Sequence, residues 1–455
     1  MLSRRPLRRP EFRLTLLALA LSPNAYATEL TWEGYYRGRA RIFDSLSLSD
    51  TNPNAEGTSN MLDHRLLLRP SFLISEHAAI RTEIDFFRLV DWGTEPDTYT
   101  DAVTGETIAV ANADGVTTTG SGLQAVRAWG EGYTPIGRFS LGRMPMQWGA
   151  GILWNDGNAP DAEYGDTADR FQFSTRVGPV FALAAFDVQY EGLLNAPDDM
   201  QAITLALGYR SETAGVGLLN NYRYRPEKPY NWQAYTGDLW AYAELGPVRA
   251  ELEGVGVFAG GNLETGANDV QVMAFGGMIN GKYTLDKFSL EAEFGAASGD
   301  EDPTDSTIHT FHFDRDHNLS LMMFEEPMPT LAAAVANDAN DGRNYDAVLT
   351  GDGISNAIYF RPAVHYGVLP NLDASLGWLV ATEAQGAGDH EASAGGYGNE
   401  FDLTLKYNPY PHLYATGTAG LFLPGPYYSK YKDEDFGGGF DKATFGGQLL
   451  GTVEF

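Results

Sequence analysis

Apolar and polar residues alternate along much of this chain, in runs of about ten residues. In the run 168–177, Phe171 and Phe173 share one parity, whereas Arg170 and Gln172 share the other. Because the side chains of a strand point alternately to its two faces, each such run predicts a β-strand with one apolar and one polar face. Helical periodicity is nearly absent from the middle of the sequence, so the pattern predicts an all-β protein.

The connections between these runs come in two lengths. Turn residues mark eight short connections, at 75–77, 134–137, 177–179, 212–215, 246–247, 285–287, 369–371 and 408–411. Nine longer segments, mostly rich in Asp, Asn and Gly, lie at 44–60, 92–120, 148–167, 191–200, 226–235, 259–269, 299–354, 383–396 and 424–442. Short and long connections alternate without exception.

This alternation of connection lengths separates a membrane barrel from a soluble β-sandwich, whose strands show the same polar and apolar pattern. The connections join about 18 strands, with short periplasmic turns and long extracellular loops, which is the layout of a transmembrane antiparallel β-barrel. Strand boundaries drawn from one sequence shift by a few residues, so the range is about 16 to 20 strands. Phe445, Leu449, Val453 and Phe455 share a parity, and a terminal aromatic residue fits the last strand of such a barrel.

The first residues predict secretion. Residues 1–13 carry five Arg and one acid, Glu11, and an apolar run from Leu14 to Leu21 leads to Ala25-Tyr26-Ala27. This layout predicts a cleaved signal peptide over 1–27 and a single barrel domain over 28–455. No stretch of the chain reaches the 18 consecutive apolar residues of a membrane-spanning helix. The predicted location is the bacterial outer membrane, where lipid and lipopolysaccharide would surround the barrel.

Charge and composition narrow the function. The chain has 60 acidic and 31 basic residues and a formal net charge of −29, which disfavours nucleic acid as a partner. It has no cysteine, which excludes disulfides and thiolate metal sites. The closest Ser–His pairing, His317 and Ser320, lacks any flanking motif that would position a nucleophile, so an enzyme is not expected.

The polar faces of the predicted strands carry many arginines. Guanidinium groups are planar bidentate donors for carboxylates, sulfates and phosphates, and charged rings in a narrow pore select ions by sign. Acids such as Glu83 and Asp85 share this face, so structural cross-strand pairing stays open as an alternative. The candidate pore-lining residues are Arg37, Arg39, Arg41, Arg65, Arg69, Arg81, Arg127, Arg143, Arg170, Arg176 and Arg361.

Two stretches resemble a known family. Residues 288–305, followed by Thr310-Phe311 and His317, resemble the strand-to-loop signature of the alginate-export family of outer-membrane porins. The run 141–149 resembles the Gly-Arg strand end of that family, with Met144 at the position where the family usually has Gln. The resemblance is specific over these two stretches and otherwise rests on the architecture.

The resemblance implies a monomeric barrel with an arginine-rich lumen. It also implies passive secretion of an acidic exopolysaccharide, controlled by a loop or by a periplasmic partner. Export of an anionic polysaccharide is therefore the first hypothesis. A general or small-solute diffusion porin, with small anions among its solutes, is the alternative, because both classes share the fold and the chemistry of the wall.

The segment 299–354 is too long for a simple connection. Two arrangements stay open: a mobile surface flap, or a segment that folds over or into the pore with a short helix over 331–336 capped by Thr330. Asp300, Asp302 and Asp305 are weak candidate ligands for loosely bound Ca²⁺, because their spacing lacks the Gly and terminal Glu of an EF-hand loop. No other cofactor is expected.

Overall fold

The structure is a computed structural model of the chain. It describes residues 29–46, 48, 58–87, 98–100, 107–109, 123–190, 200–225, 231–262, 269–301, 305–326, 328, 353–386, 395–429, 432–433, 438–439 and 441–455. The predicted signal peptide lies outside the described residues.

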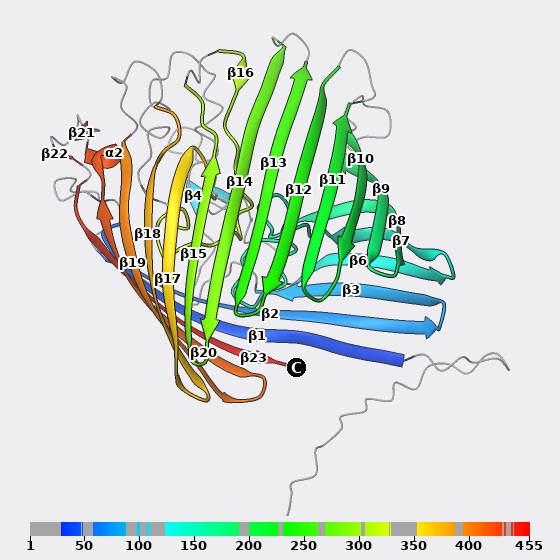
Figure 1. Cartoon of the computed structure of the whole chain (residues 1–455), viewed down its shortest axis with the longest axis horizontal. Helices are drawn as coiled ribbons and strands as arrows, with labels where there is room; N and C mark the ends of the chain where they lie inside the picture. Colours follow the sequence, from blue (N-terminus) through cyan, green and yellow to red (C-terminus); the bar gives the residue numbers. More distant parts are fainter. Residues whose placement is uncertain are drawn as a thin grey trace, which may run out of the picture.

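In the described part of the chain, 18 strands join edge to edge into one closed antiparallel barrel (Figure 1). These strands are β1 Glu29–Asp44, β2 Thr58–Ser75, β3 Ala78–Phe86, β6 Leu123–Thr134, β7 Gly137–Pro145, β8 Thr167–Val177, β9 Val180–Tyr190, β10 Met200–Arg210, β11 Ala214–Tyr224, β12 Gln233–Leu245, β13 Val248–Gly261, β14 Val270–Leu285, β15 Phe288–Ala297, β17 Ala357–Leu369, β18 Leu372–Glu383, β19 Gly396–Tyr410, β20 Leu413–Pro424 and β23 Thr444–Glu454. The predicted fold class is confirmed.

The first and last strands close the barrel. β1 pairs with β23 along its length, from Tyr35 opposite Glu454 to Asp44 opposite Phe445. Gly34 and Phe455 then exchange two backbone hydrogen bonds of 3.1 Å at the end of the seam. Closure leaves no unpaired sheet edge, which is what allows a β-sheet to cross a bilayer.

Short elements decorate the loops. β4 Thr98–Thr100 pairs with β5 Thr107–Ala109, β21 Lys432–Asp433 pairs with β22 Gly438–Gly439, β16 Thr307–Ile308 runs parallel to β14, and α2 spans Pro426–Ser429. No helix among the described residues combines the length and apolar character that crossing a membrane requires.

The two kinds of connection are confirmed. Every predicted short turn joins two neighbouring strands and contains only two or three residues outside them, such as Gly246-Pro247 between β12 and β13. Gly178 and Gly246 take φ values of 58° and 62°, in the left-handed region that a tight turn needs and that glycine adopts without strain. All short turns lie at one end of the barrel, called here the turn side, and the long connections lie at the other, the loop side (Figure 1).

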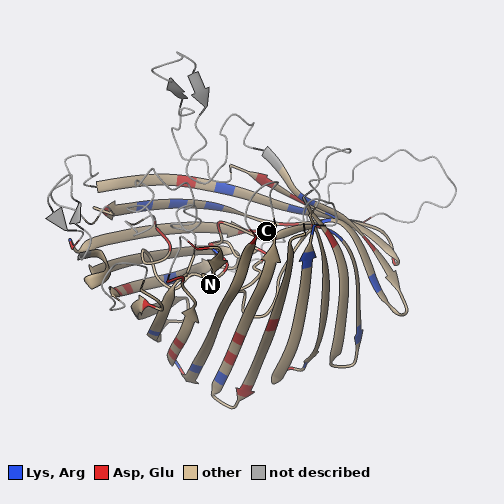
Figure 2. Ribbon diagram, turned by 90° about the horizontal axis from the view of Figure 1, so that it is seen from above, with Lys and Arg blue, Asp and Glu red and all other residues tan. Residues whose placement is uncertain are grey.

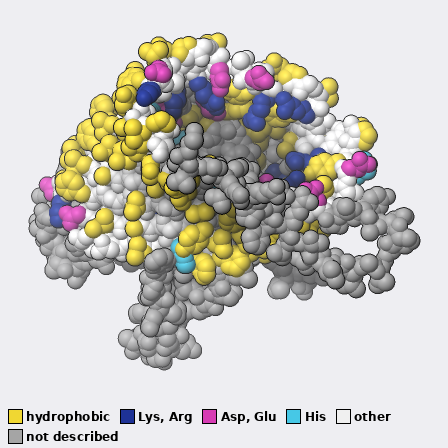
Figure 3. Space-filling view, turned by 90° about the horizontal axis from the view of Figure 1, so that it is seen from below, with side chains coloured by type: hydrophobic (Ala, Val, Ile, Leu, Met, Phe, Trp, Pro, Cys, Tyr) yellow, Lys and Arg dark blue, Asp and Glu magenta, His cyan; other side chains and the backbone are white. Residues whose placement is uncertain are grey.

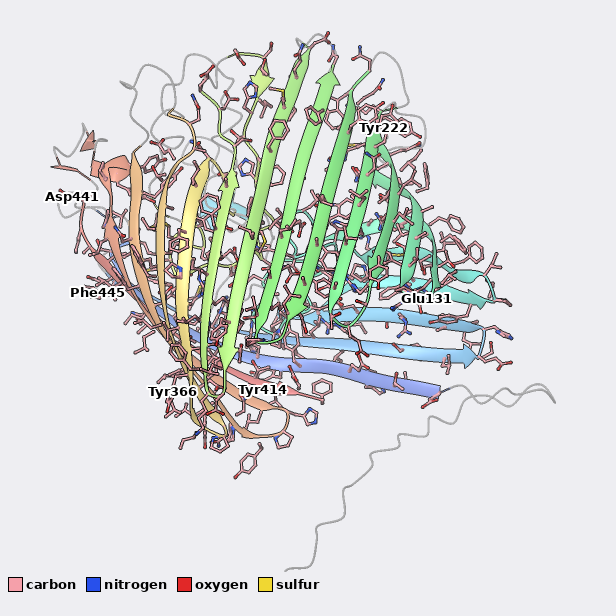
Figure 4. All side chains as sticks on the ribbon, in the orientation of Figure 1. Glu131, Tyr222, Tyr366, Tyr414, Asp441 and Phe445 are labelled. Atoms are coloured by element: carbon pink, nitrogen blue, oxygen red, sulfur yellow. The ribbon has the colours of Figure 1, made fainter. Side chains whose placement is uncertain are left out.

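The two faces of each strand differ as the alternation predicts. On β8, Phe171 is 49 % exposed on the outer face, whereas Arg170 is 6 % exposed on the inner face. Tyrosines lie near both ends of the strands, with Tyr222 toward the loop side and Tyr366 toward the turn side (Figure 4). An apolar belt with aromatic residues at its rims is the outer surface that a membrane barrel presents to lipid.

The outward assignment of this belt predicts a cost for a charge at its middle. Leu205 lies at the centre of β10 and is 55 % exposed on the outer face. We expect Leu205→Arg to destabilise the folded barrel by about 2–4 kcal/mol, because a cation at mid-depth faces hydrocarbon. Urea titration of the refolded protein, followed by the mobility of unboiled samples on gels, measures this loss. Leu205→Met is the matched control and should unfold like the wild type.

Candidate functional site

Arginines lie on neighbouring strands that form one side of the barrel (Figure 2), and their burial places their side chains on its inner face. The side chains of Arg37, Arg39, Arg65, Arg127 and Arg170 are nearly inaccessible to solvent. Arg41, Arg69, Arg81 and Arg361 lie partly buried on the same inner face, and Arg176 is exposed at the turn side. The group Arg37, Arg39, Arg41, Arg65, Arg69, Arg81, Arg127 and Arg170 is called the arginine wall below.

Carboxylates on neighbouring strands neutralise the arginine wall. Arg39 donates a hydrogen bond to Asp63 at 2.7 Å, and Arg65 forms an ion pair with Asp85 at 2.6 Å. Further along the sheet, Arg170 contacts Asp187 at 2.5 Å. Glu83 accepts hydrogen bonds from both Arg69 and Arg127. Removing one partner of such a buried pair costs about 3–5 kcal/mol, because the other charge is then left without compensation.

Glu131 lies on β6 toward the turn side (Figure 4), and its carboxylate accepts hydrogen bonds from several side chains. Its carboxylate accepts from Arg81 Nε at 2.7 Å, from Trp129 Nε1 at 3.0 Å and from Arg138 Nη1 at 3.3 Å. The hydroxyl of Tyr133 donates to the same carboxylate. One buried acid therefore holds two arginines in fixed orientations.

Arg143 does not line the pore, and its predicted place there is corrected. It shares the outer parity of β7 with Phe139 and Leu141, and its side chain is 56 % exposed. On that outer face it makes a two-pronged ion pair with Asp169, with hydrogen bonds of 2.9 and 2.6 Å. The resemblance of the Gly-Arg run to the family suggested that Arg143 lines the pore. The alternation along β7 instead points its side chain to the outer face, away from the inward Ser140.

The connection 146–166 between β7 and β8 folds into the barrel and lies against the arginine wall. Its backbone carbonyls accept hydrogen bonds from the guanidinium groups: Arg37 to Ala162 at 3.0 Å, Arg65 to Ala162 at 3.0 Å, Arg69 to Asn158 at 3.3 Å and Arg127 to Asp156 at 2.7 Å. The side chain of Glu163 pairs with Arg39. Sequence analysis placed this segment among the external loops, because no local signal reports where its carbonyl groups will point.

Two inward carboxylates from the opposite wall hold the start of this connection. Trp148 Nε1 donates to Asp238 of β12 at 2.7 Å, and Gly151 N donates to Glu253 of β13 at 3.0 Å. Gly149 has a φ of 53°, and a Cβ atom there would collide with the Glu253 carboxylate. The connection thus bridges the lumen between two walls, and glycine is needed at its closest approach.

The segment 305–326 of the longest connection begins at β16, beside the loop-side end of β14, and its residues from 311 onward lie inside the barrel. The amides of Leu321 and Met322 donate to Glu400 of β19 at 3.0 and 2.8 Å, and Arg361 of β17 donates to the carbonyl of Leu319. Phe311, Phe313, Leu321, Met322 and Met323 are buried in the same cluster. The helix predicted over 331–336, with Thr330 as its cap, lies outside the described residues.

The two inward segments contact each other. The carboxylate of Asp316 accepts hydrogen bonds from the backbone amides of Glu163 at 2.9 Å and Tyr164 at 3.0 Å, and Asp314 N donates to Ile152 O at 2.9 Å. Between them and the wall remains a cavity of about 230 Å³, lined in part by Arg39, Arg41 and Arg361. This cavity is called the central cavity below.

The candidate calcium ligands do not converge in the part of the chain that the structure describes. Asp300 is buried and accepts a hydrogen bond from His309 N at 3.0 Å, whereas Asp305 is exposed and caps Thr307 N at 2.6 Å. Asp302 lies outside the described residues. No group of three or more His, Cys, Asp or Glu residues that could hold a metal ion occurs among the described residues.

The hydrogen bonds of Asp316 predict that this side chain keeps the lumen narrow. We expect Asp316→Ala to weaken the contact between the two inward segments by about 1.5–3 kcal/mol, because a charged acceptor of two amides is lost. Single-channel conductance in planar bilayers should rise. Asp305→Ala, which removes an exposed cap within one segment, should leave conductance unchanged, and an equal rise in both variants would contradict the prediction.

Asp314 predicts a pH dependence of the same contact. Burial, and then the charge of Asp166, raise the pKa of Asp314 to about 7 from 3.8. The raised pKa means that Asp314 binds a proton more tightly in the folded segment than in the unfolded chain. Its contribution to the stability of the fold is therefore fully present below the unfolded pKa and is lost as the pH rises to about 7. Hydrogen exchange of 305–326 should therefore accelerate across this window beyond its intrinsic pH dependence. Asp314→Asn should remove that excess.

Solved structures of similar architecture are outer-membrane porins. Pseudomonas aeruginosa OccK9 (OpdG) matches with a TM-score of 0.54 at 12 % identity, over 94 % of this chain and 99 % of that chain. A BenF-like porin from Pseudomonas fluorescens Pf-5 also gives 0.54, at 9 % identity, over 94 % and 98 %. Pseudomonas aeruginosa OpdQ gives 0.53 at 8 % identity, over 94 % and 98 %.

No protein-family model matches the chain, and no curated protein matches it by sequence. The resemblance to outer-membrane porins is therefore confirmed at the level of the fold, whereas membership of the alginate-export family is not shown. At identities this low, structural similarity establishes architecture alone. The chain has the fold of the bacterial outer-membrane β-barrel porins.

Proposed function

We propose that this protein is a small-solute diffusion porin of the outer membrane with a preference for small anions. The observation that carries the proposal is the pair of inward segments, 146–166 and 305–326, which contact each other in the lumen beside the arginine wall and line the central cavity of about 230 Å³. A solute of a few heavy atoms fits a space of this size, whereas a folded or hydrated polymer does not. We keep a monomer surrounded by lipid and lipopolysaccharide as the expected state.

Four arginines and six acids line the central cavity, so the proposed preference for anions depends on how many of those acids are protonated or paired. Arg361 donates to a backbone carbonyl there and has no ion pair with a carboxylate in the described part of the chain. Burial raises the pKa of Glu325 and of Glu326, so these acids give up their protons less readily than solvated ones. The planar N–H pairs of the guanidinium groups suit carboxylate and phosphate oxygens.

Export of an anionic exopolysaccharide is the less favoured candidate. It rests on the resemblance of the run 288–305, where the structure places β15 and the start of the longest connection. A polymer would need the inward segment 305–326 to leave the lumen, and that segment is held by Glu400, Arg361 and Asp316. Diffusion of small solutes needs no such rearrangement.

Reversal potentials in planar bilayers test the proposal. Under a potassium chloride gradient we expect the wild type to pass chloride in preference to potassium. Arg41→Gln combined with Arg361→Gln should reduce this preference severalfold, because two cations leave the lining of the central cavity. Arg143→Gln is the matched control: it removes an arginine from the outer face and should not change the selectivity.

Two results would contradict this function. Cation selectivity of the wild type would show that the acids of the lumen outweigh the arginines. Translocation of a long acidic polysaccharide into liposomes that contain the purified protein would favour export instead. The result would be clearest if small sugars passed no faster than the polymer.

A further inference from the structure

One arginine of the barrel strands faces the lipid instead of the lumen. Among the Lys and Arg residues of the 18 barrel strands that the structure describes, Arg143 of β7 alone has the outer parity. Seen from below, hydrophobic side chains cover much of the periphery of the molecule, whereas most basic side chains gather around the central hollow (Figure 3). A charge on the outer face is costly at mid-depth in a bilayer and much less so near the rims, so the depth of Arg143 matters.

Arg143 lies at the loop-side rim of the apolar belt. It stands opposite Asp169 in the ladder of β7 and β8, which ends two residue pairs further on, where Pro145 stands opposite Thr167. The long loops of outer-membrane barrels are extracellular, so this rim lies in the outer leaflet. That leaflet consists largely of lipopolysaccharide, whose lipid A anchor joins phosphorylated sugars to several acyl chains.

The ion pair of Arg143 and Asp169 continues into a row of polar side chains along the same rim. In the backbone register, the outward residues that follow Asp169 from strand to strand are Val188 of β9, Gln201 of β10, Tyr224 of β11 and Gln233 of β12. The group Arg143, Asp169, Gln201, Tyr224 and Gln233 is called the polar row below. Since neighbouring strands lie about 4.8 Å apart, the polar row is roughly 24 Å long.

Several N–H groups of the polar row are free to bind a ligand. Asp169 accepts hydrogen bonds from Nε and Nη2 of Arg143, which fixes the plane of the guanidinium and leaves Nη1 without an acceptor in the described part of the chain. Tyr224 donates to Oε1 of Gln201 at 2.9 Å, and Tyr222 donates to Oε1 of Gln233 at 3.1 Å. Each glutamine thus has its carbonyl oxygen engaged and its NH₂ group available. Such donors suit the oxygens of phosphates and sugars.

An apolar groove lies deeper in the belt, below the polar row. Ala182 and Ala184 of β9 are small and lie between larger side chains such as Phe173 of β8 and Leu205 of β10, and the outer face is hollowed there into a groove of about 590 Å³. Phe171, one register step closer to the rim, belongs to the row that separates the groove from the polar row. The backbones of β8 and β10 lie about 10 Å apart, which leaves a trough that one acyl chain can fill.

From this arrangement we propose that the outer face of β7–β12 binds lipid A of the outer leaflet. A phosphate of lipid A accepts hydrogen bonds from Nη1 of Arg143, the sugars bind the amides of Gln201 and Gln233, and one acyl chain lies in the groove over Ala184. The donors lie at the rim and the groove lies deeper, which is the order in which the sugar and acyl parts of this lipid enter the membrane. The site is outside the pore, so the inference does not depend on which solute the pore carries.

Native mass spectrometry of the purified, folded full-length barrel, titrated in detergent with bisphosphorylated lipid A, tests the proposal. Lipid A should bind at least about tenfold more tightly than phosphatidylglycerol, whose small headgroup does not extend along the polar row. Arg143→Gln should weaken the binding of lipid A about tenfold, because charge-assisted hydrogen bonds to a phosphate are lost. Dephosphorylated lipid A should bind the wild type equally weakly, and Arg143→Gln should not weaken its binding further.

A second pair of variants tests the groove. Ala184→Phe places a ring on its floor and should weaken the binding of lipid A severalfold. Val180→Phe is the matched control, because Val180 lies on the outer face of the same strand, 45 % exposed, but does not line the groove. Arg249→Gln is the control for charge, because Arg249 is at the turn side and pairs with Glu244 and Glu251. Both controls should bind lipid A like the wild type, and unboiled gel mobility should show that every variant is folded.

Three results would overturn the lipid A site. They are equal affinities for lipid A and phosphatidylglycerol, wild-type affinity for lipid A in Arg143→Gln, and equal affinities in Ala184→Phe and Val180→Phe. None of them bears on the proposed function, because Arg143 faces away from the lumen. Conversely, a cation-selective pore whose variants show the expected pattern of lipid A binding would support the site and overturn the anion preference.

Discussion

The buried guanidinium groups of the arginine wall need hydrogen-bond acceptors, and the interior of the barrel is arranged around that need. Each guanidinium offers five N–H donors, whereas one carboxylate on a neighbouring strand satisfies only some of them. The carbonyls of 156–162 supply further acceptors for Arg37, Arg65, Arg69 and Arg127. The inward position of this connection is favoured for that reason, because each guanidinium N–H that is buried without an acceptor would destabilise the folded barrel.

Local rules were sufficient to predict the barrel. All eight short turns and the inward parity of Arg39 and Arg65 follow from the period of two along each strand and from turn residues such as Gly178-Pro179. A closed sheet has one face in lipid and one in the lumen, so a single correct parity assignment orients a whole strand. The sequence alone also indicated that acids share the inner face, although not which acid pairs with which arginine.

The interior could not be predicted, because it depends on contacts between residues far apart in the sequence. Asp316 meets Glu163 and Tyr164 across more than 150 positions, and the Trp148–Asp238 hydrogen bond spans 90. Neither pair leaves a local pattern. Arg143 shows the opposite error: a motif-based resemblance suggested a role in the pore, while the simple alternation along β7 already placed the residue on the outer face.

The contrast between neutralised and uncompensated arginines has a consequence for transport. A pore must attract its solute strongly enough to admit it and weakly enough to release it. In the arginine wall, each arginine forms an ion pair with at least one carboxylate, so much of the positive charge that a passing anion would meet is already offset. Arg176 and Arg210 form no ion pair in the described part of the chain and lie exposed at the turn-side ends of β8 and β10. Uncompensated positive charge therefore lies at the turn-side end of the barrel, from which a solute can escape into water, whereas the arginine wall is close to electrostatic balance.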